Sequence, residues 1–128
     1  MKMSRLDIPK CKVGECPIWD VAEQALYFID IFDRKIHRYD PAGDSTRSWD
    51  TPKAPGALAI REGGGAIYGA QTDIYTLDLQ SGVSTLVTDS GKGERVHFND
   101  GKTDRQGRLL LGLSDTHYAD PHPVGGLY

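Results

Sequence analysis

The chain has 128 residues, carries 15 Lys and Arg against 18 Asp and Glu, and has a formal net charge of -3. That size is typical of one domain, and the charge balance argues against nucleic acid or an acidic membrane surface as a partner. The N-terminal segment lacks an apolar core of signal-peptide length and no apolar run could span a bilayer, so we expect a cytoplasmic protein with no membrane partner.

Cys11 and Cys16 are five positions apart, with no His beside them. A structural zinc site needs a second pair of ligands at suitable spacing, and the sequence has none. Two reduced thiols are the favoured interpretation, and a disulfide that closes a short loop is the alternative.

Four strand patterns follow one another in the first part of the chain. Residues 25–31 are dense in β-branched and aromatic side chains, which favours a mostly buried strand. Residues 35–40 alternate polar and apolar side chains, as a strand with one exposed face does, so we expect His37 at the surface. Residues 45–49 are short and polar enough for an edge strand. With residues 13–20, they predict four consecutive strands separated by polar turns.

The same order then returns. The strands predicted for the second and third rounds are residues 57–60, 66–70, 74–78, 83–88, 108–112 and 125–128. Leu26, Ile67 and Leu109 hold equivalent positions, 41 and then 42 residues apart. The chain is therefore a repeat of short strands in which no segment has helical periodicity.

A four-strand repeat of about 40 to 45 residues is typical of a β-propeller blade, so the predicted fold class is an all-β propeller with about three blades. An irregular β-sandwich also has short strands and frequent turns, but it does not repeat one strand order three times. Closed propellers have about four to eight blades. We therefore expect a fragment of a longer ring, a ring completed by self-association through open blade edges, or an irregular third blade.

Residues 98–108 combine two turn signals with a cluster of side-chain oxygens and amides. Gly101 and Gly107 permit positive φ, which a turn or a close backbone approach requires. One interpretation is two tight loops flanking a strand, with Asn99 and Asp100 capping a turn. The other is a polar loop at the mouth of a site, which requires a partner elsewhere in the chain.

That partner is Gly-Glu-Cys-Pro-Ile-Trp at residues 14–19. Together with the 98–108 motif it resembles the SMP-30/gluconolactonase/LRE family, and two strands of the first round also resemble that family's first blade. The resemblance runs from about Val13 to the last residue but covers only about the N-terminal half of a family member. Residues 1–128 are accordingly expected to be the N-terminal portion of a single propeller domain.

The resemblance implies a six-bladed propeller with one divalent metal ion in its central channel, in an enzyme that hydrolyses sugar lactones. It assigns Glu15 to the metal ion and places Asn99 in the same channel, in contact with the substrate or a metal-bound water. The family's other ligands are an Asn and an Asp that is also the general base. They lie in later blades, so no catalytic residue is assigned within this chain.

The substrate contacts depart from the family pattern. Members often carry Arg two residues before the Asn, where this chain has His97, with Arg95 two residues earlier. His97 has a shorter side chain than Arg. An acidic residue often follows the next strand, and Asp115 and His117 are the nearest candidates. We take Asn99, His97 and Asp115 as the candidate substrate-binding residues.

Oxygen ligands from Glu and Asn suit Ca²⁺, Mg²⁺ or Mn²⁺, and a mixed site can take Zn²⁺. The expected cofactor is one divalent ion, Ca²⁺ or Zn²⁺ in the first place and Mg²⁺ or Mn²⁺ next. The alternative for Glu15 is an exposed acid at a strand start, and His117 and His122 lack the spacing of a metal site. The predicted function is metal-dependent hydrolysis of a sugar lactone. The alternatives are a non-catalytic propeller module and a truncated product without activity.

Overall fold

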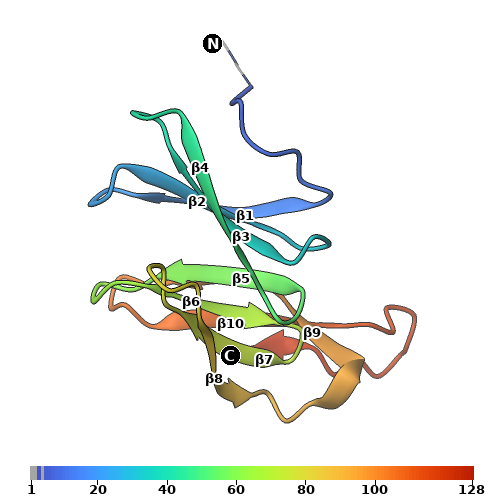
Figure 1. Ribbon diagram of the computed structural model, residues 1–128. Coiled ribbons are helices and arrows are strands. Elements are labelled where there is room, and N and C mark those ends of the chain that lie inside the picture. The colour runs from blue at the N-terminus through green and yellow to red at the C-terminus, as the bar shows by residue number, and fades with distance from the viewer. Residues whose placement is uncertain (1–2, 4) are drawn as a thin grey trace.

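The structure is a computed structural model that describes Met3 and residues 5–128, and it is built from antiparallel strands in three sheets (Figure 1). The strands of the first two sheets are β1 (Gly14–Asp20), β2 (Ala25–Asp30), β3 (Lys35–Asp40), β4 (Ser45–Asp50), β5 (Pro55–Ile60), β6 (Ala66–Ala70), β7 (Asp73–Leu77) and β8 (Ser84–Asp89). The third sheet consists of β9 (Val96–Thr103), β10 (Leu109–Asp115) and β11 (Gly126–Leu127), and the 3-10 turn η1 (Gly93–Arg95) precedes it.

Each sheet is one blade of a β-propeller. Strands β1–β4 form blade 1 and β5–β8 form blade 2, each in sequence order, and β9–β11 form blade 3. The first strand of each blade is its inner strand, and β5 contacts both β1 and β9. The predicted all-β propeller is therefore confirmed, as is the short strand expected at residues 125–128, which pairs with β10. No helix among the described residues is long and apolar enough to cross a membrane.

Two apolar layers hold the blades together, with blade 2 between them. On one face of blade 2, Tyr68 and Leu77 pack with Tyr27, Ile29 and Ile36 of blade 1, and all five side chains are almost free of solvent. Complete burial of a large apolar side chain stabilises a fold by about 1.5–3 kcal/mol. This layer therefore joins the first two blades into one unit.

Blade 2 uses its other face to bind blade 3. Ala57 and Ile74 pack there against Val96, Phe98 and Leu111. Neighbouring residues of a strand point to opposite faces, so β5 and β7 supply side chains to both layers. The run of apolar residues in β5 and β6 follows from this two-sided burial.

The inner strands β5 and β9 approach each other most closely at Gly56. A Cβ atom on Gly56 would lie 1.8 Å from the carbonyl oxygen of Phe98, so no side chain fits there. Gly69 of β6 is similarly constrained, because a Cβ atom would come within 2.7 Å of the Phe98 ring. These two glycines let blade 3 dock on blade 2.

Of the two interpretations of residues 98–108, the one in which Asn99 and Asp100 cap a turn is wrong. Both residues lie inside β9, where Asp100 pairs with Gly112 and Gly101 with Leu111 of β10. A Cβ atom on Gly101 would lie 2.7 Å from a methyl carbon of Leu111. The glycine that suggested a turn is therefore needed for packing within the sheet.

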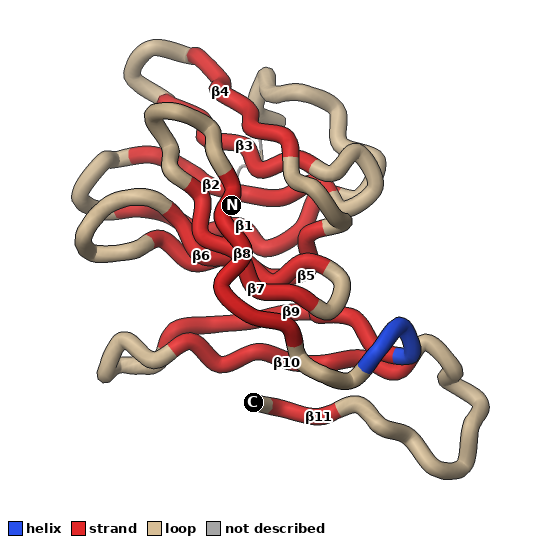
Figure 2. The backbone as a smooth tube through the Cα atoms, turned by 60° about the horizontal axis from the view of Figure 1, so that its bottom comes forward, coloured by secondary structure: helices blue, strands red, loops and turns tan. Residues whose placement is uncertain are grey.

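The second turn signal of the 98–108 motif is confirmed. Gly107 has a φ of +78°, and its N–H donates to the carbonyl oxygen of Asp104 at 3.1 Å. The Asp104 side chain also accepts the N–H groups of Gln106 and Arg108 at 2.8 and 2.9 Å. This turn joins β9 to β10 at the end of the blade opposite η1, as Figure 2 shows.

The surface position expected for His37 is also wrong. His37 exposes only 3% of its surface, its ring stacks on Phe28 with centroids 4.8 Å apart, and its Nδ1 lies 2.7 Å from the hydroxyl oxygen of Ser48. Burial of the ring lowers the pKa of His37 below its usual value of 6.5. The alternating pattern of β3 therefore marks a strand that is buried on both faces.

We expect Gly56→Ala to destabilise the fold by about 3 kcal/mol or more, because the added methyl group overlaps backbone that other contacts hold in place. Gly63→Ala is the matched control, since nothing lies within 4 Å of a Cβ atom there. Urea denaturation of both variants measures the difference, and equal midpoints for the two would contradict the close contact of β5 and β9.

Candidate functional site

A hollow of about 740 Å³ lies at the end of the propeller where the inner strands begin. Its walls are the starts of β5 and β9, the turns after β2 and β6, the turn η1 and the loop that follows β10. These segments gather at one end because antiparallel strands return the chain there after every second strand. We call this cavity the inner-strand hollow.

Strand β9 contributes two polar side chains to the inner-strand hollow, His97 and Asn99. Phe98, between them, is buried in the layer with blade 2, and its N–H donates to the carbonyl oxygen of Gln71 at 2.7 Å. Because neighbouring residues of a strand point to opposite faces, burial of the Phe98 ring directs both neighbours away from that layer. One apolar anchor therefore fixes the position of the polar pair.

The inner strands are irregular next to this hollow. The pairing of β9 with β10 skips Asn99, and the pairing of β5 with β6 skips Gly56 in the same way. A bulge of this kind leaves one residue without a ladder partner and redirects its side chain, which is common beside functional sites. Asn99 is exposed, so its amide group is available to a ligand.

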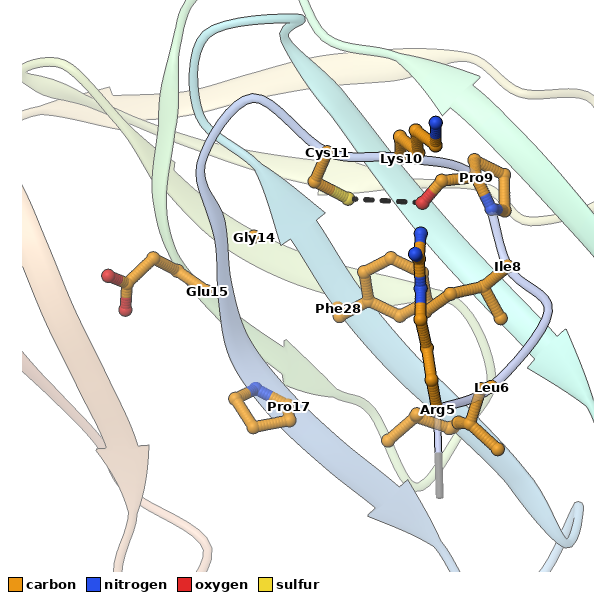
Figure 3. A pocket seen from close by; sticks show the side chains of 11 residues that line it. Arg5, Leu6, Ile8, Pro9, Lys10, Cys11, Gly14, Glu15, Pro17 and Phe28 are labelled. Carbon is orange, nitrogen blue, oxygen red and sulfur yellow. Dashed lines mark hydrogen bonds between the residues drawn. The ribbon is translucent and has the colours of Figure 1, made fainter. Parts of the chain in front are cut away.

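Glu15 lies at the start of β1, beside the bulge of that strand, where Cys16 has a φ of +54°. The side chain is exposed and borders a second cavity of about 590 Å³, which residues 5–11 form over blade 1. Figure 3 shows the Glu15 carboxylate pointing away from Phe28 and the apolar side chains of this second cavity. The carboxylate is therefore directed to the side of β1 that is free of the N-terminal segment.

The two motifs approach each other through Cys16 and Asp100. Burial raises the pKa of the Cys16 thiol, and the negative charge of Asp100 adds to that effect. The thiol itself lies 3.7 Å from the carbonyl oxygen of Leu58 in β5. Both cysteines are free thiols. Residues of β1, β5 and β9 also line one cavity, which brings parts of the segments 14–19 and 98–108 into one region.

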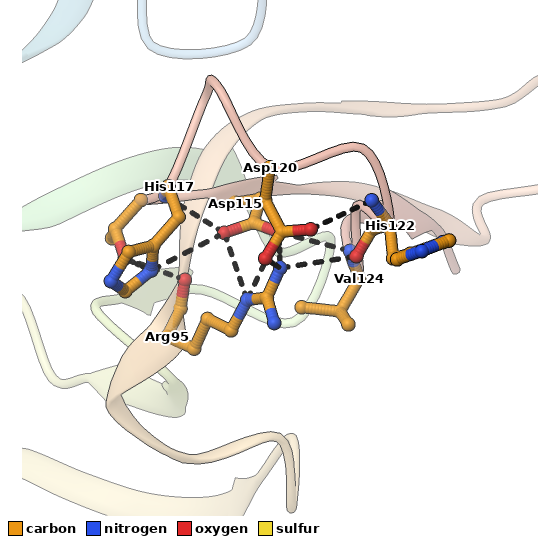
Figure 4. A network of polar contacts seen from close by, with 7 residues as sticks. Arg95, Asp115, His117, Asp120, His122 and Val124 are labelled. Carbon is orange, nitrogen blue, oxygen red and sulfur yellow. Dashed lines mark hydrogen bonds and ion pairs between the residues drawn. The ribbon is translucent and has the colours of Figure 1, made fainter.

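Asp115 ends β10 and is buried beside Arg95 (Figure 4). Arg95 donates to its carboxylate from Nη2 at 2.9 Å and from Nε at 3.2 Å, and the N–H groups of His117 and Val124 donate at 2.8 and 3.0 Å. The Arg95 side chain, followed by these backbone donors, holds the pKa of Asp115 well below its usual value of 3.8. A carboxylate has about four acceptor positions, and here protein donors occupy them.

Residues 13–128 match the family described as SMP-30/Gluconolactonase/LRE-like region. The chain belongs to this family. The resemblance predicted from residues 14–19 and 98–108 is therefore confirmed.

The relatives of this SMP-30/gluconolactonase chain include enzymes that act on lactones. It is 38% identical to a 6-deoxy-6-sulfogluconolactonase of Pseudomonas putida over 101 residues. This aligned region covers 78% of this chain and 35% of the relative. It is 33% identical to regucalcin of Xenopus laevis over 102 residues, and this aligned region covers 79% of this chain and 34% of the relative. The aligned region thus spans about a third of the length of these relatives.

A solved structure supports the fold. The calcium-binding protein regucalcin of Agrobacterium tumefaciens superposes with a TM-score of 0.83 at 23% identity, over 96% of this chain and 41% of that one. At this identity the superposition shows the propeller fold alone.

The four candidate residues of this family member occupy three places. His97 and Asn99 share the inner-strand hollow, Glu15 borders the second cavity, and Asp115 lies in the ion pair with Arg95. Among the described residues, no group of three or more His, Cys, Asp or Glu side chains is placed to hold a metal ion. The metal-binding and substrate-binding roles stay predictions, and the contacts of Asp115 give it a structural task.

Sequence reasoning missed several residues that line the inner-strand hollow, among them Gln71, Thr72 and Tyr118. Gln71 follows β6 with a φ of +50°, which is unusual for a residue with a side chain and leaves no mark in the sequence. Tyr118 is an aromatic residue in a loop of polar and proline residues, and that contrast was the signal available for it.

The ion pair of Asp115 gives a pH dependence. Because its folded-state pKa is lowered, its stabilising contribution is complete above the usual pKa of 3.8 and declines as the pH falls toward the folded-state pKa. Asp115→Asn should therefore be less stable than the natural chain at pH 7, and the difference should shrink below about pH 4. Thermal unfolding across this pH range measures it, with the exposed Glu62→Gln as control. A difference that does not vary with pH would contradict the ion pair.

Proposed function

We propose that the protein carrying this chain is a metal-dependent hydrolase that opens sugar lactones. The observation that carries the proposal is the pair His97 and Asn99, which project from one bulged inner strand into the inner-strand hollow of a chain in the SMP-30/gluconolactonase family. The 38% identity to a sulfogluconolactonase supports the same reaction class. Residues 1–128 would then be the N-terminal portion of its catalytic propeller.

The inner-strand hollow suits a sugar lactone in size and chemistry. Small-molecule sites usually measure about 300–1,000 Å³ and combine apolar walls with a few polar groups that orient the ligand. The amide of Asn99 offers two N–H donors and one acceptor, and the ring nitrogens of His97 offer a donor and an acceptor. Thr72 and Gln71 add polar groups from blade 2. These groups can orient a ring that carries several hydroxyl groups.

Glu15 is the residue of this chain that would hold a divalent metal ion, with Asn99 in contact with the substrate or a metal-bound water. Both supply hard oxygen atoms, both are exposed, and the Glu15 carboxylate points away from the apolar cavity beside it. Residues of β1 and β9 line one common cavity beside β5, which supports a shared region for the two strands. When bound, such an ion supplies a Lewis acid that polarises a carbonyl group. Two oxygen donors do not complete a site for Ca²⁺, which takes 6–8 oxygen ligands, and we propose that further ligands come from outside this chain.

The general base is proposed to come from outside this chain as well. Glu94 is the carboxylate that lines the inner-strand hollow, and it is exposed on η1. Its position makes it the matched control for Glu15, because both side chains are exposed acids near the inner-strand ends. A role in proton transfer would make Glu94 indispensable, whereas a role in the wall would not.

We expect purified protein, expressed at the full length that its gene encodes, to hydrolyse glucono-lactone and to lose this activity with a chelator. Glu15→Gln should lower kcat/KM by about a hundredfold, the upper range for weakened metal sites, with partial recovery at high metal concentration. Glu94→Gln should retain activity within about threefold, well below the loss for a general base. Chelator-resistant turnover would contradict metal dependence, and full activity in Glu15→Gln would remove Glu15 from the site.

A further inference from the structure

Arg95 is the centre of the contacts that shape residues 116–125, the loop between β10 and β11 (Figure 4). Its guanidinium joins Asp115, just before the loop, to Asp120 in the middle, with N–O distances of 2.9 and 2.8 Å. The same Nη2 atom donates to the carbonyl oxygen of His122 at 3.1 Å. The Arg95 side chain therefore attaches Asp115 and two positions of the loop, Asp120 and His122, to η1.

Further hydrogen bonds attach the loop at both of its ends. The carbonyl oxygen of Arg95 accepts the N–H and the hydroxyl of Thr116 at 2.8 Å each. The Asp115 carboxylate accepts the N–H groups of His117 and Val124. Apart from Asp120, all residues of the loop are exposed. The loop is therefore held by this polar network and not by apolar burial.

The attached loop forms a wall of the inner-strand hollow. Thr116 and Tyr118 line the hollow together with Phe32 of blade 1 and with His97 and Asn99 of β9. Tyr118 exposes 78% of its surface, so its ring is open to a ligand. An aromatic face of this kind offers a large apolar contact whose edge still reaches water through the hydroxyl group.

We infer that Arg95 and Asp115 are positioning residues for the substrate site. Their ion pair holds the 116–125 loop so that Tyr118 stands as an aromatic wall beside His97 and Asn99, against which the ring of a sugar lactone packs. This inference rests on the proposed function. Neither Arg95 nor Asp115 touches the substrate; both act through the loop.

The chemistry of arginine explains why a positive charge alone is not sufficient at position 95. A guanidinium presents several N–H donors in a fixed planar fork, so one Arg can bind two carboxylates and a carbonyl oxygen at once. A lysine ammonium is a point charge on a flexible stem and does not reproduce that geometry. Arg95→Lys should therefore keep the charge but release part of the loop.

The test compares Arg95→Gln, Tyr118→Ala and the double variant in lactone hydrolysis. Each single change should raise KM by roughly tenfold, with kcat changed less than about twofold, because loss of one aromatic contact corresponds to about that factor. The double variant should be no worse than Tyr118→Ala, since residues that act through one contact are not additive. Arg95→Lys should fall between the natural chain and Arg95→Gln.

Arg108→Gln is the matched control, because Arg108 pairs with Asp104 at 2.6 Å in the same blade but outside the hollow. Its KM should equal that of the natural protein. An unchanged KM in Arg95→Gln, or additive effects in the double variant, would overturn the inference while leaving lactone hydrolysis intact.

Amide hydrogen exchange gives a readout that does not depend on activity. The N–H groups of His117, His122 and Val124 should be protected in the natural protein and should exchange at least about tenfold faster in Arg95→Gln, as they do when a local structure opens more readily. If the natural protein hydrolyses no lactone, the proposed function fails. Loss of protection in Arg95→Gln would still support the positioning of the loop, and unchanged protection would overturn it.

Discussion

The close contact of β5 and β9 determines where the polar residues of this chain lie. Gly56 leaves the carbonyl oxygen of Phe98 room to reach β5, and the N–H of Phe98 binds Gln71 of blade 2. The ring of Phe98 is also buried, so the side chains of its two neighbours, His97 and Asn99, point away from the layer that holds the ring. His97 and Asn99 therefore reach the inner-strand hollow because an apolar residue between them is fixed on three sides.

Buried carboxylates stabilise the same end of the propeller. Asp30 accepts the N–H groups of Lys12, Val13, Phe32 and Asp33, which ties the entry to β1 to the turn after β2. Burial raises the pKa of Asp30, but these four donors outweigh it and the net pKa is lowered. Asp73 forms an ion pair with Lys53, and Asp115 forms one with Arg95. Both pairs stabilise this end of the propeller. An unpaired buried charge is costly, so each of these carboxylates requires the loop that satisfies it. The walls of the hollow are thus ordered by polar contacts.

The sequence predicted the strands and their repetition well, because alternation and turn residues are local signals. It failed at Asn99 and Asp100, where the local sequence is typical of a turn. There β9 continues instead as a strand, because Asp100 and Gly101 pair with Gly112 and Leu111 of β10. It failed at His37 for the same kind of reason, since the Phe28 ring and the Ser48 hydroxyl that bury His37 belong to neighbouring strands. Both errors arise where tertiary contacts override a local preference.

The candidate site was predictable only in part, and the limit is physical. His97 and Asn99 are two positions apart, so regular strand geometry predicts a shared face for them, and both line the hollow although the ladder skips Asn99. The pairing of Arg95 with Asp115 spans 20 positions and depends on the register of β9 against β10, which a motif search does not provide. Glu15 and Asn99 each lie at or beside a bulge of their inner strand, and a bulge changes which way a side chain points, so strand alternation does not predict their directions. The inner-strand hollow is accordingly lined by residues from all three blades, and no single blade contains them all.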